Sequence, residues 1–490
     1  MKLKIKKFMV DAGRPVVFMH ENTARNLDVH VGDRVEIQKN KRKIVAVVDL
    51  VIGFLNINEI ALSRDILNYE TLKSGDLVDV KAVFSQRSSL IIAKKMQGEK
   101  LSKKDIYTII EDIVNNILTE PEIAYFVSAV YEKCFDIDET IYLTEAIYKT
   151  GNILSWKNNV VADKHSIGGI PGNRTSPIVV SICAAAGLTL PKTSSRAITS
   201  AAGTADVMEV ITKVDLESSN LKKIVEKTGA CLAWGGSLGL APADDKLIKV
   251  ERILNVDPES QLIASIIAKK LAVGSKYVLI DIPYGDGAKV SKSEAEKLKR
   301  KFLIIAKHFR INMKVVLTLG NQPIGDGIGP VLEIIDVLKI LNNSSTAPKD
   351  LEDKSIFLAG EILEMTGKSQ KGSGKLTANQ ILYSGKALKK FNEIINAQGR
   401  KKVKLSPAKF KKTIFSKKNG TIKIIDNKII NIMGRKIGCP ADKRAGLYIH
   451  KHLGNKVKRG DELLTFYAES KEKLNDSLTF FKSTRPIKIN

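Results

Sequence analysis

The stretch DKHSIGGIPGNRTSP (163–177) decides the fold, and one apolar run separates it from PKTSSRAITSAAGTADVMEV (191–210). Both stretches are rich in glycine, serine and threonine, and both lack the regular apolar spacing of core helices and strands. Loops of this composition present backbone N–H groups and hydroxyls to anions. The two stretches therefore predict two anion-binding loops in one fold.

The runs around these loops predict an α/β domain. From Val160 to about Leu341, strand-like apolar runs alternate with glycine loops and helical stretches. The strand-like runs are 178–190, 276–285 and 312–320. Residues 260–275 instead have the pattern of a strongly apolar helix. This alternation is typical of a largely parallel sheet, in which the ligand loops follow strand ends.

Two other patterns precede the α/β domain. Residues 27–38 and 71–83 each place Gly-Asp in a turn before an alternating strand, which suggests two halves of a small pseudo-duplicated barrel. From about Ser102 the apolar spacing becomes helical, with Pro121 suited to a first helical position and Gly151 to a helix end. The helical runs are 103–118, 120–134 and 136–151.

These patterns predict a multi-domain fold that combines α/β with all-α parts. Residues 445–468 have the pattern of short strands around a Gly-Asp turn, so a small β-rich (α+β) domain closes the chain. The predicted domains are a β-barrel-like domain at 1–85, a helical domain at 86–158 joined by about 245–276, an α/β phosphate-binding domain with a mostly parallel sheet at 159–244 and 277–405, and a β-rich domain at 406–490.

The composition argues against a membrane protein and a disulfide scaffold. Of 490 residues 43% are hydrophobic, mean hydropathy is −0.07, and no apolar run approaches the length of a membrane span. No signal peptide follows the basic N-terminus. The cysteines form no CxxC, and the six histidines add no metal-ligand spacing, so we expect isolated thiols in a reducing cytoplasm and no metal site. The cysteines are Cys134, Cys183, Cys231 and Cys439.

The net charge of +26 favours phosphate-bearing partners, which are either nucleic acids or small metabolites. Residues 399–425 hold ten basic residues and no acidic one. This run has no zinc finger, no RNP-type strand motif and no interleaved aromatics. We therefore favour a solvated basic face over an RNA site.

The first loop combines backbone freedom with charge. Its glycines let the backbone approach a ligand, while a lysine and a serine offer a point charge and a hydroxyl donor. A helix beginning near Pro177 would add positive partial charge. The residues concerned are Lys164, Ser166, Gly168, Gly169 and Gly172.

The second loop adds hydroxyls and one arginine. Its donor residues are Ser194, Ser195, Arg196, Thr199, Ser200, Gly203 and Thr204. Arg196 could instead pair with Asp206 or Glu209 as a structural bridge, and the sequence leaves both interpretations open. Neither loop is GxxxxGK[ST] or GxGxxG, which disfavours the standard ATP and NAD folds. Two such loops indicate two anions, or a reaction that moves phosphate onto a phosphorylated partner.

Both loops carry a family resemblance. DKHSIGGIPGNRTS resembles the phosphate loop of the thymidine and pyrimidine nucleoside phosphorylases, and SSRAITSAAGTADVMEV is similar to their signature. The likeness continues through 264–287, 320–338 and 385–399, and covers roughly residues 100 to 480. The resemblance implies the multi-domain fold above and a pentosyltransferase activity.

Two features of the sequence differ from the nucleoside enzymes and resemble one branch of that family. The run IPGNRTS is one residue longer than in the nucleoside enzymes, and about 85 residues of β pattern precede the helical part. Both features are similar to archaeal phosphorylases of AMP and related nucleoside 5′-monophosphates. The resemblance implies that AMP, and also CMP and UMP, react with inorganic phosphate to give free base and ribose 1,5-bisphosphate. Phosphate is a co-substrate in this reaction, and no cofactor is expected.

One alternative is a nucleoside phosphorylase, which the two differences disfavour. Another is an anthranilate-type phosphoribosyltransferase, which normally requires an acidic magnesium-binding motif that we do not find in the sequence. The resemblance also implies a homodimer or larger homo-oligomer, with hinge motion between the helical and α/β domains.

The resemblance also assigns binding residues. The positions matching phosphate contacts are Lys164, Ser166, Ser194 and Thr204. The positions matching nucleotide contacts are Gly169, Ser195, Arg196, Ala197, Ile198, Thr199, Ser200, Thr204, Ser265 and Lys289. Which residue contacts which phosphate stays open.

The departing base needs a proton, and the resemblance implies Asp257 as its donor. The alternative is that Asp257 caps the following helix. Ser265 and Lys269 keep the helical spacing of a base site, but Arg252 is out of register with the arginine that accompanies them in the family, so base preference stays open. His165 could assist at the phosphate loop or simply pack there.

Overall fold

The computed structural model describes all residues except 70–71, 84–85, 158–159 and 198–199. It divides into two compact units, one made of residues 1–151 and 241–265 and the other of 152–240 and 266–490. Within the described residues, no helix is long and apolar enough to cross a membrane.

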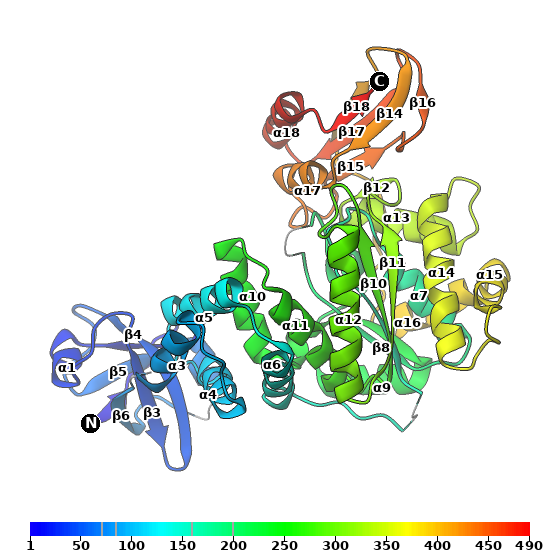
Figure 1. Ribbon diagram of the computed structural model, residues 1–490. Coiled ribbons are helices and arrows are strands. Elements are labelled where there is room, and N and C mark those ends of the chain that lie inside the picture. The colour runs from blue at the N-terminus through cyan, green and yellow to red at the C-terminus, as the bar shows by residue number, and fades with distance from the viewer. Residues whose placement is uncertain (70–71, 84–85, 158–159, 198–199) are drawn as a thin grey trace. The chain divides into compact units, whose positions relative to one another are not determined.

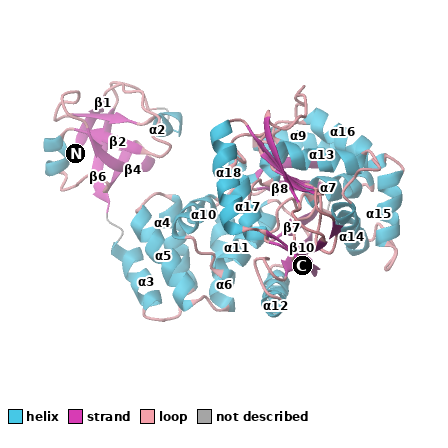
Figure 2. Cartoon of the chain, turned by 90° about the horizontal axis from the view of Figure 1, so that it is seen from above, coloured by secondary structure: helices cyan, strands magenta, loops and turns pink. Residues whose placement is uncertain are grey.

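The first unit begins with a strand-rich part that includes β1, β2, β4 and β6 (Figure 2). Its six strands close into a barrel in the order β1-β5-β2-β4-β3-β6. The strands are β1 (Lys2–Ile5), β2 (Val16–Met19), β3 (Arg34–Lys39), β4 (Arg42–Leu50), β5 (Glu59–Leu62) and β6 (Leu77–Val83), with short helices α1 (Glu21–Asn26) and α2 (Arg64–Tyr69) between them. The two Gly-Asp turns contain Gly32 and Gly75, which both have positive φ, and they precede β3 and β6. These two strands pair antiparallel.

Helices make up the rest of the first unit. They are α3 (Gln86–Met96), α4 (Lys103–Val114), α5 (Glu120–Lys133), α6 (Ile137–Lys149) and α10 (Pro242–Leu254). Capping boxes begin α4, α5 and α6. The side chains of Ser102, Thr119 and Asp136 each accept the backbone N–H of the residue three positions on, and their own backbone N–H groups donate to the carboxylate of that residue. Helix α11 (Glu259–Ala272) covers most of the predicted apolar helix at 260–275 and continues into the second unit.

The second unit is built on parallel strands. Strands β7 (Ala162–Ser166), β10 (Tyr277–Tyr284) and β11 (Asn312–Leu319) form a sheet in the order β11-β10-β7, and β8 (Leu190–Ser194) pairs with β9 (Ala230–Trp234). A parallel bridge between Val161 and Thr189 links the two sheets. Helices α12 (Lys292–His308) and α14 (Lys349–Met365) lie on opposite sides of β10 (Figure 1).

The strand predicted at 178–190 was wrong. Most of it is helix α7 (Thr175–Ala185), and strand β8 begins only at Leu190. Ten of the eleven residues of α7 are buried, so the helix has no polar face to reveal its period. The remaining helices of this α/β part are α8 (Thr204–Met208), α9 (Ser218–Thr228), α13 (Pro330–Leu341), α15 (Gly374–Tyr383) and α16 (Lys386–Ala397).

The C-terminal part of the second unit adds two small sheets. One has the order β12-β15-β17-β13 and the other β16-β14-β18. The strands are β12 (Gly327–Ile328), β13 (Phe410–Phe415), β14 (Gly420–Ile425), β15 (Gly446–Ile449), β16 (Lys456–Val457), β17 (Glu462–Ala468) and β18 (Ile487–Ile489), with helices α17 (Asn427–Lys436) and α18 (Lys471–Thr484). All ten basic side chains of the run 399–425 are exposed.

Candidate active site

The first loop follows the end of β7 and leads into α7. Gly168, Gly169 and Gly172 all have positive φ, between 70° and 93°. A Cβ on Gly172 would lie 2.3 Å from the backbone oxygen of Ile324, so only glycine fits this turn. Helix α7 starts at Thr175, two residues before Pro177, so its amino terminus is next to the loop.

Lys164 lies at the base of this loop and is 1% exposed. Its Nζ donates a hydrogen bond of 2.6 Å to Thr175 Oγ1. Burial lowers the pKa of Lys164 to about 7, although the carboxylate of Asp281 acts in the opposite direction. Asp281 is itself 3.0 Å from Lys354 Nζ. Burial disfavours the charged form of this lysine, and an anion bound next to it would stabilise that form.

The other face of β7 carries a second buried ionic group. Asp163 lies 2.5 Å from Lys270 Nζ and 3.3 Å from Lys192 Nζ. Burial alone would raise the pKa of Asp163, but the two lysines hold it below its usual value. His165 follows on the same strand, and burial and nearby lysines lower its pKa well below the usual value, so its ring is neutral at pH 7.

The second loop follows β8, the neighbour of β7 through the Val161–Thr189 bridge. Asp206 Oδ2 accepts backbone N–H groups from Ala197 at 2.7 Å and from Gly203 at 2.9 Å, which folds the loop back on itself. At the start of the loop, Ser194 Oγ donates to the Ala233 carbonyl at 3.2 Å.

The Arg196 side chain is bound to two carboxylates, while its contact with the nucleotide stays a prediction. Its guanidinium donates to both oxygens of Glu209, at 2.8 and 2.7 Å, and to Asp206 at 3.3 Å. These bonds lower the pKa of Glu209 to about 2, with Lys443 contributing at 2.8 Å. The guanidinium also lies 4.8 Å from the ring centroid of Trp234. The structural bridge is therefore formed.

Two side chains that are not among the predicted site residues join the loops. Arg174, at the end of the first loop, donates to Thr204 Oγ1 at 2.9 Å and to the Ala202 carbonyl at 3.0 Å. Asn431, on α17, donates to the Gly169 carbonyl and accepts from Ala201 N–H, each at 3.2 Å. Neither contact could be predicted from the sequence, because the partners of a buried polar side chain depend on which segments pack around it.

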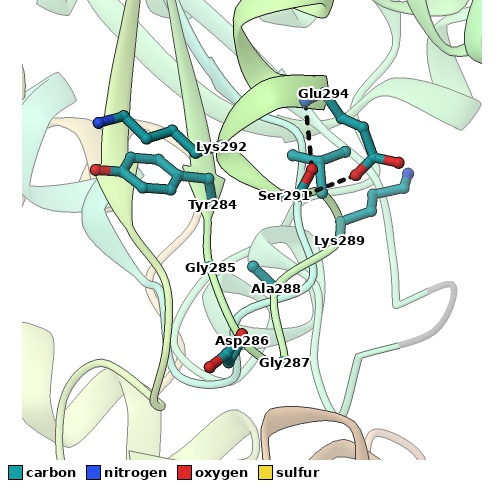
Figure 3. Close-up of a pocket in the computed structure, with 10 residues that line it drawn as sticks. Tyr284, Gly285, Asp286, Gly287, Ala288, Lys289, Ser291, Lys292 and Glu294 are labelled. Atoms are coloured by element: carbon teal, nitrogen blue, oxygen red, sulfur yellow. Dashed lines mark hydrogen bonds between the residues drawn. The ribbon is translucent and has the colours of Figure 1, made fainter.

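The loop between β10 and α12 lines an open pocket of about 500 Å³ (Figure 3). Its lining residues run from Tyr284 to Lys292 and include Glu294. Figure 3 shows Lys292 beside the Tyr284 ring and Lys289 on the other side of the loop. A Cβ on Gly169 would be 3.3 Å from Lys289 Cβ, so the pocket loop lies against the first anion loop.

The structure thus brings together in the second unit most residues predicted to bind phosphate or nucleotide. They are Lys164, Ser166, Gly169, Ser194, Ser195, Arg196, Ala197, Ser200, Thr204 and Lys289. Ile198 and Thr199 lie outside the described residues. Lys269 also belongs to this unit, on α11. Among the described residues, no group of three or more His, Cys, Asp or Glu is placed to hold a metal ion.

Asp257, Ser265 and Arg252 belong to the first unit. Ser265 Oγ donates to the buried Asp244 at 2.8 Å. The base-contact and acid roles of Ser265 and Asp257 stay predictions.

Domain models of known families match this architecture in order. The helical bundle domain of a glycosyl transferase family matches residues 89–151, and the a/b domain of the same family matches 158–388. The C-terminal domain of pyrimidine nucleoside phosphorylase matches 421–488. Together with the two loops, these matches define a glycosyl transferase of the nucleoside phosphorylase class.

Similar proteins of known name narrow the class. The AMP phosphorylase of Pyrococcus furiosus is 44% identical over 100% of this chain and 98% of its own length. The AMP phosphorylases of Methanococcus vannielii and Thermococcus kodakarensis are 41% and 43% identical, over 97% and 98% of their lengths and 99% and 100% of this chain. The chain belongs to the AMP phosphorylase family.

A solved structure shares the fold of part of the chain. Anthranilate phosphoribosyltransferase from Thermus thermophilus has a TM-score of 0.53 and 16% identity, and the match covers 63% of this chain and 99% of that protein. At this identity the likeness concerns the fold alone.

Proposed function

We propose that the protein catalyses the reversible phosphorolysis of AMP, giving adenine and ribose 1,5-bisphosphate. An oxygen of inorganic phosphate forms a bond to the anomeric carbon, and the bond from that carbon to the base breaks. The base takes the electron pair and a proton. We propose CMP and UMP as further substrates, and no cofactor.

The observation that carries this proposal is the pair of loops at the ends of β7 and β8, which hydrogen bonds of Arg174 and Asn431 hold together. Both carry serine or threonine hydroxyls, and Lys164 adds a buried amine at the base of the first loop. A reaction between phosphate and a nucleotide has two anionic groups to hold, the attacking phosphate and the 5′-phosphate. Two adjacent donor-rich loops suit this need.

The proposed roles follow the chemistry of each group. Lys164, Ser166, Ser194 and Thr204 would hold phosphate as it approaches the positively charged sugar. Asp257 would protonate the leaving base. Arg196 would act mainly by shaping the second loop, because its guanidinium is bound to Glu209.

Release of free base tests the proposal. AMP, CMP and UMP are compared with adenosine and uridine, with and without phosphate. We expect the nucleotides to release base when phosphate is present, and we expect no release from the nucleosides. The Asp257→Asn variant should lose at least about a hundredfold in kcat. Release from nucleosides but not from nucleotides would contradict the proposal. Full activity of Asp257→Asn would remove the acid assignment.

A further inference from the structure

Helix α17 belongs to the C-terminal part of the chain, yet it contacts both anion loops. The side-chain amide of Asn431 spans the space between them: Nδ2 donates to the Gly169 carbonyl, and Oδ1 accepts from Ala201 N–H, each at 3.2 Å. The residue is 7% exposed. Both ends of a buried amide are thus satisfied, one by each loop.

The backbone of α17 is also held close to the second loop. A Cβ on Gly434, one turn beyond Asn431, would lie 2.6 Å from Ala201 Cβ. Such a close approach leaves little freedom for the helix to slide along the loop. The distance that the Asn431 amide spans is therefore fixed by packing as well as by hydrogen bonds.

Arg174 joins the same loops at a second point. Its guanidinium holds Thr204 Oγ1 and the Ala202 carbonyl, and Glu333 fixes the guanidinium from behind at 2.6 Å. Because Thr204 Oγ1 accepts from Arg174, its own hydroxyl hydrogen can be donated to a ligand. Arg174, from the first loop, and Asn431, from α17, thus bind different atoms of the second loop.

We propose that Asn431 is a positioning residue that sets the spacing between the two anion-binding loops, and so the relative placement of the phosphate donors that the two loops carry. The inference rests on the proposed function, because that function draws the donors for inorganic phosphate from both loops. It assigns the C-terminal part of the chain a role in substrate binding. Loops held at the wrong spacing would no longer bring these donors to the same anion, so phosphate and AMP would both bind less well.

The test uses Asn431→Leu, which removes both hydrogen bonds at similar volume, and Asn431→Asp, which keeps the acceptor for Ala201 N–H but loses the donor to Gly169. Gln398→Leu is the matched control. Gln398 is also a buried amide between two backbone segments, bonded to Leu232 N–H at 2.7 Å and to the Lys213 carbonyl at 2.9 Å, outside both loops.

Three quantities are measured for each full-length variant: the urea midpoint of unfolding, the Kd for inorganic phosphate by calorimetry, and kcat and KM for AMP and phosphate. All variants should lose stability. Asn431→Leu and Asn431→Asp should raise KM for phosphate and AMP by about tenfold or more, the equivalent of one or two hydrogen bonds. Gln398→Leu should leave both KM values within about twofold of the wild type.

Unchanged KM and Kd values in a folded Asn431→Leu variant would overturn the proposal, as would equal KM changes in Gln398→Leu. If Asn431→Leu fails to fold, Asn431→Asp and Asn431→Ser decide by the same criterion. A wild type that binds phosphate but does not split AMP would contradict the proposed function. The calorimetric comparison of phosphate binding would then still decide the role of Asn431.

Discussion

Replacing Lys164 by methionine should stabilise the free protein while abolishing phosphate binding. The lysine is buried at the base of the first loop, and its pKa of about 7 lies far below the ordinary value of 10.5. Methionine fills a similar volume without a charge. The lysine is therefore expected to cost stability in the absence of anion and to contribute affinity in its presence.

The size of the effect follows from the pKa. A shift of about 3.5 units, at about 1.36 kcal/mol per unit, corresponds to a cost on the order of 5 kcal/mol for the charged lysine. Methionine also loses the hydrogen bond to Thr175 and leaves Asp281 with less positive charge around it. Each loss costs about 1–2 kcal/mol, so the net gain should be about 1–3 kcal/mol at pH 7.

The sign of the pH dependence follows from the same pKa. Between pH 7 and 10.5 the unfolded lysine keeps its proton while the folded lysine has lost it. The unfolded chain then binds more protons, so this residue makes the wild type more stable as pH rises through that window. Urea unfolding of both proteins at pH 6.5, 8 and 9.5 measures the difference. The advantage of Lys164→Met should shrink as pH rises.

Phosphate binding to the two proteins is measured by calorimetry. The prediction is refuted if Lys164→Met unfolds more than about 1 kcal/mol more easily than the wild type at pH 6.5, or if it binds phosphate as tightly. Either result would make Lys164 a structural ion-pair partner of Asp281.

Further predictions concern the shape of the loops. Gly172→Ala should destabilise by about 3 kcal/mol or more in thermal unfolding, because the new Cβ would meet the Ile324 oxygen, whereas Gly168→Ala should cost only about 1 kcal/mol of backbone strain, since nothing lies within 4 Å. Equal losses would contradict this. Arg196→Ala should cost about 1 kcal/mol in urea unfolding at pH 7, because its pair with Glu209 is partly solvated. Since the folded pKa of Glu209 is about 2, that difference should shrink as pH falls below about 4.5, and a difference unchanged at pH 3 would refute the assignment.

The anion loops could be predicted from the sequence because their chemistry is local. The first stretch shows three glycines, which all have positive φ in the structure, and a lysine, while the second stretch shows a run of hydroxyls. The same local reasoning failed at 178–190, because helix α7 is buried on every side and shows no helical period. For Arg196, the acidic partners were visible but their geometry was not.

The contacts between the loops could not be predicted from the sequence. Asn431 lies more than 200 residues from both loops along the chain, and it approaches them only because α17 packs against Ala201. Arg174 stands within a quoted motif, yet its partners Ala202 and Glu333 depend on how two loops and a helix meet. The contacts of such side chains depend on tertiary packing, which leaves no local pattern in the sequence.

The most direct test of the proposed phosphorolysis is phosphorus NMR of AMP incubated with the protein and inorganic phosphate. We expect inorganic phosphate and AMP to decline together while adenine and a sugar carrying both a 5′-phosphate and an anomeric phosphate appear in equal amounts. Adenine released at the same rate without phosphate, with ribose 5-phosphate as the sugar product, would show hydrolysis. That result would contradict the assignment of phosphate donors in the two loops to an attacking phosphate.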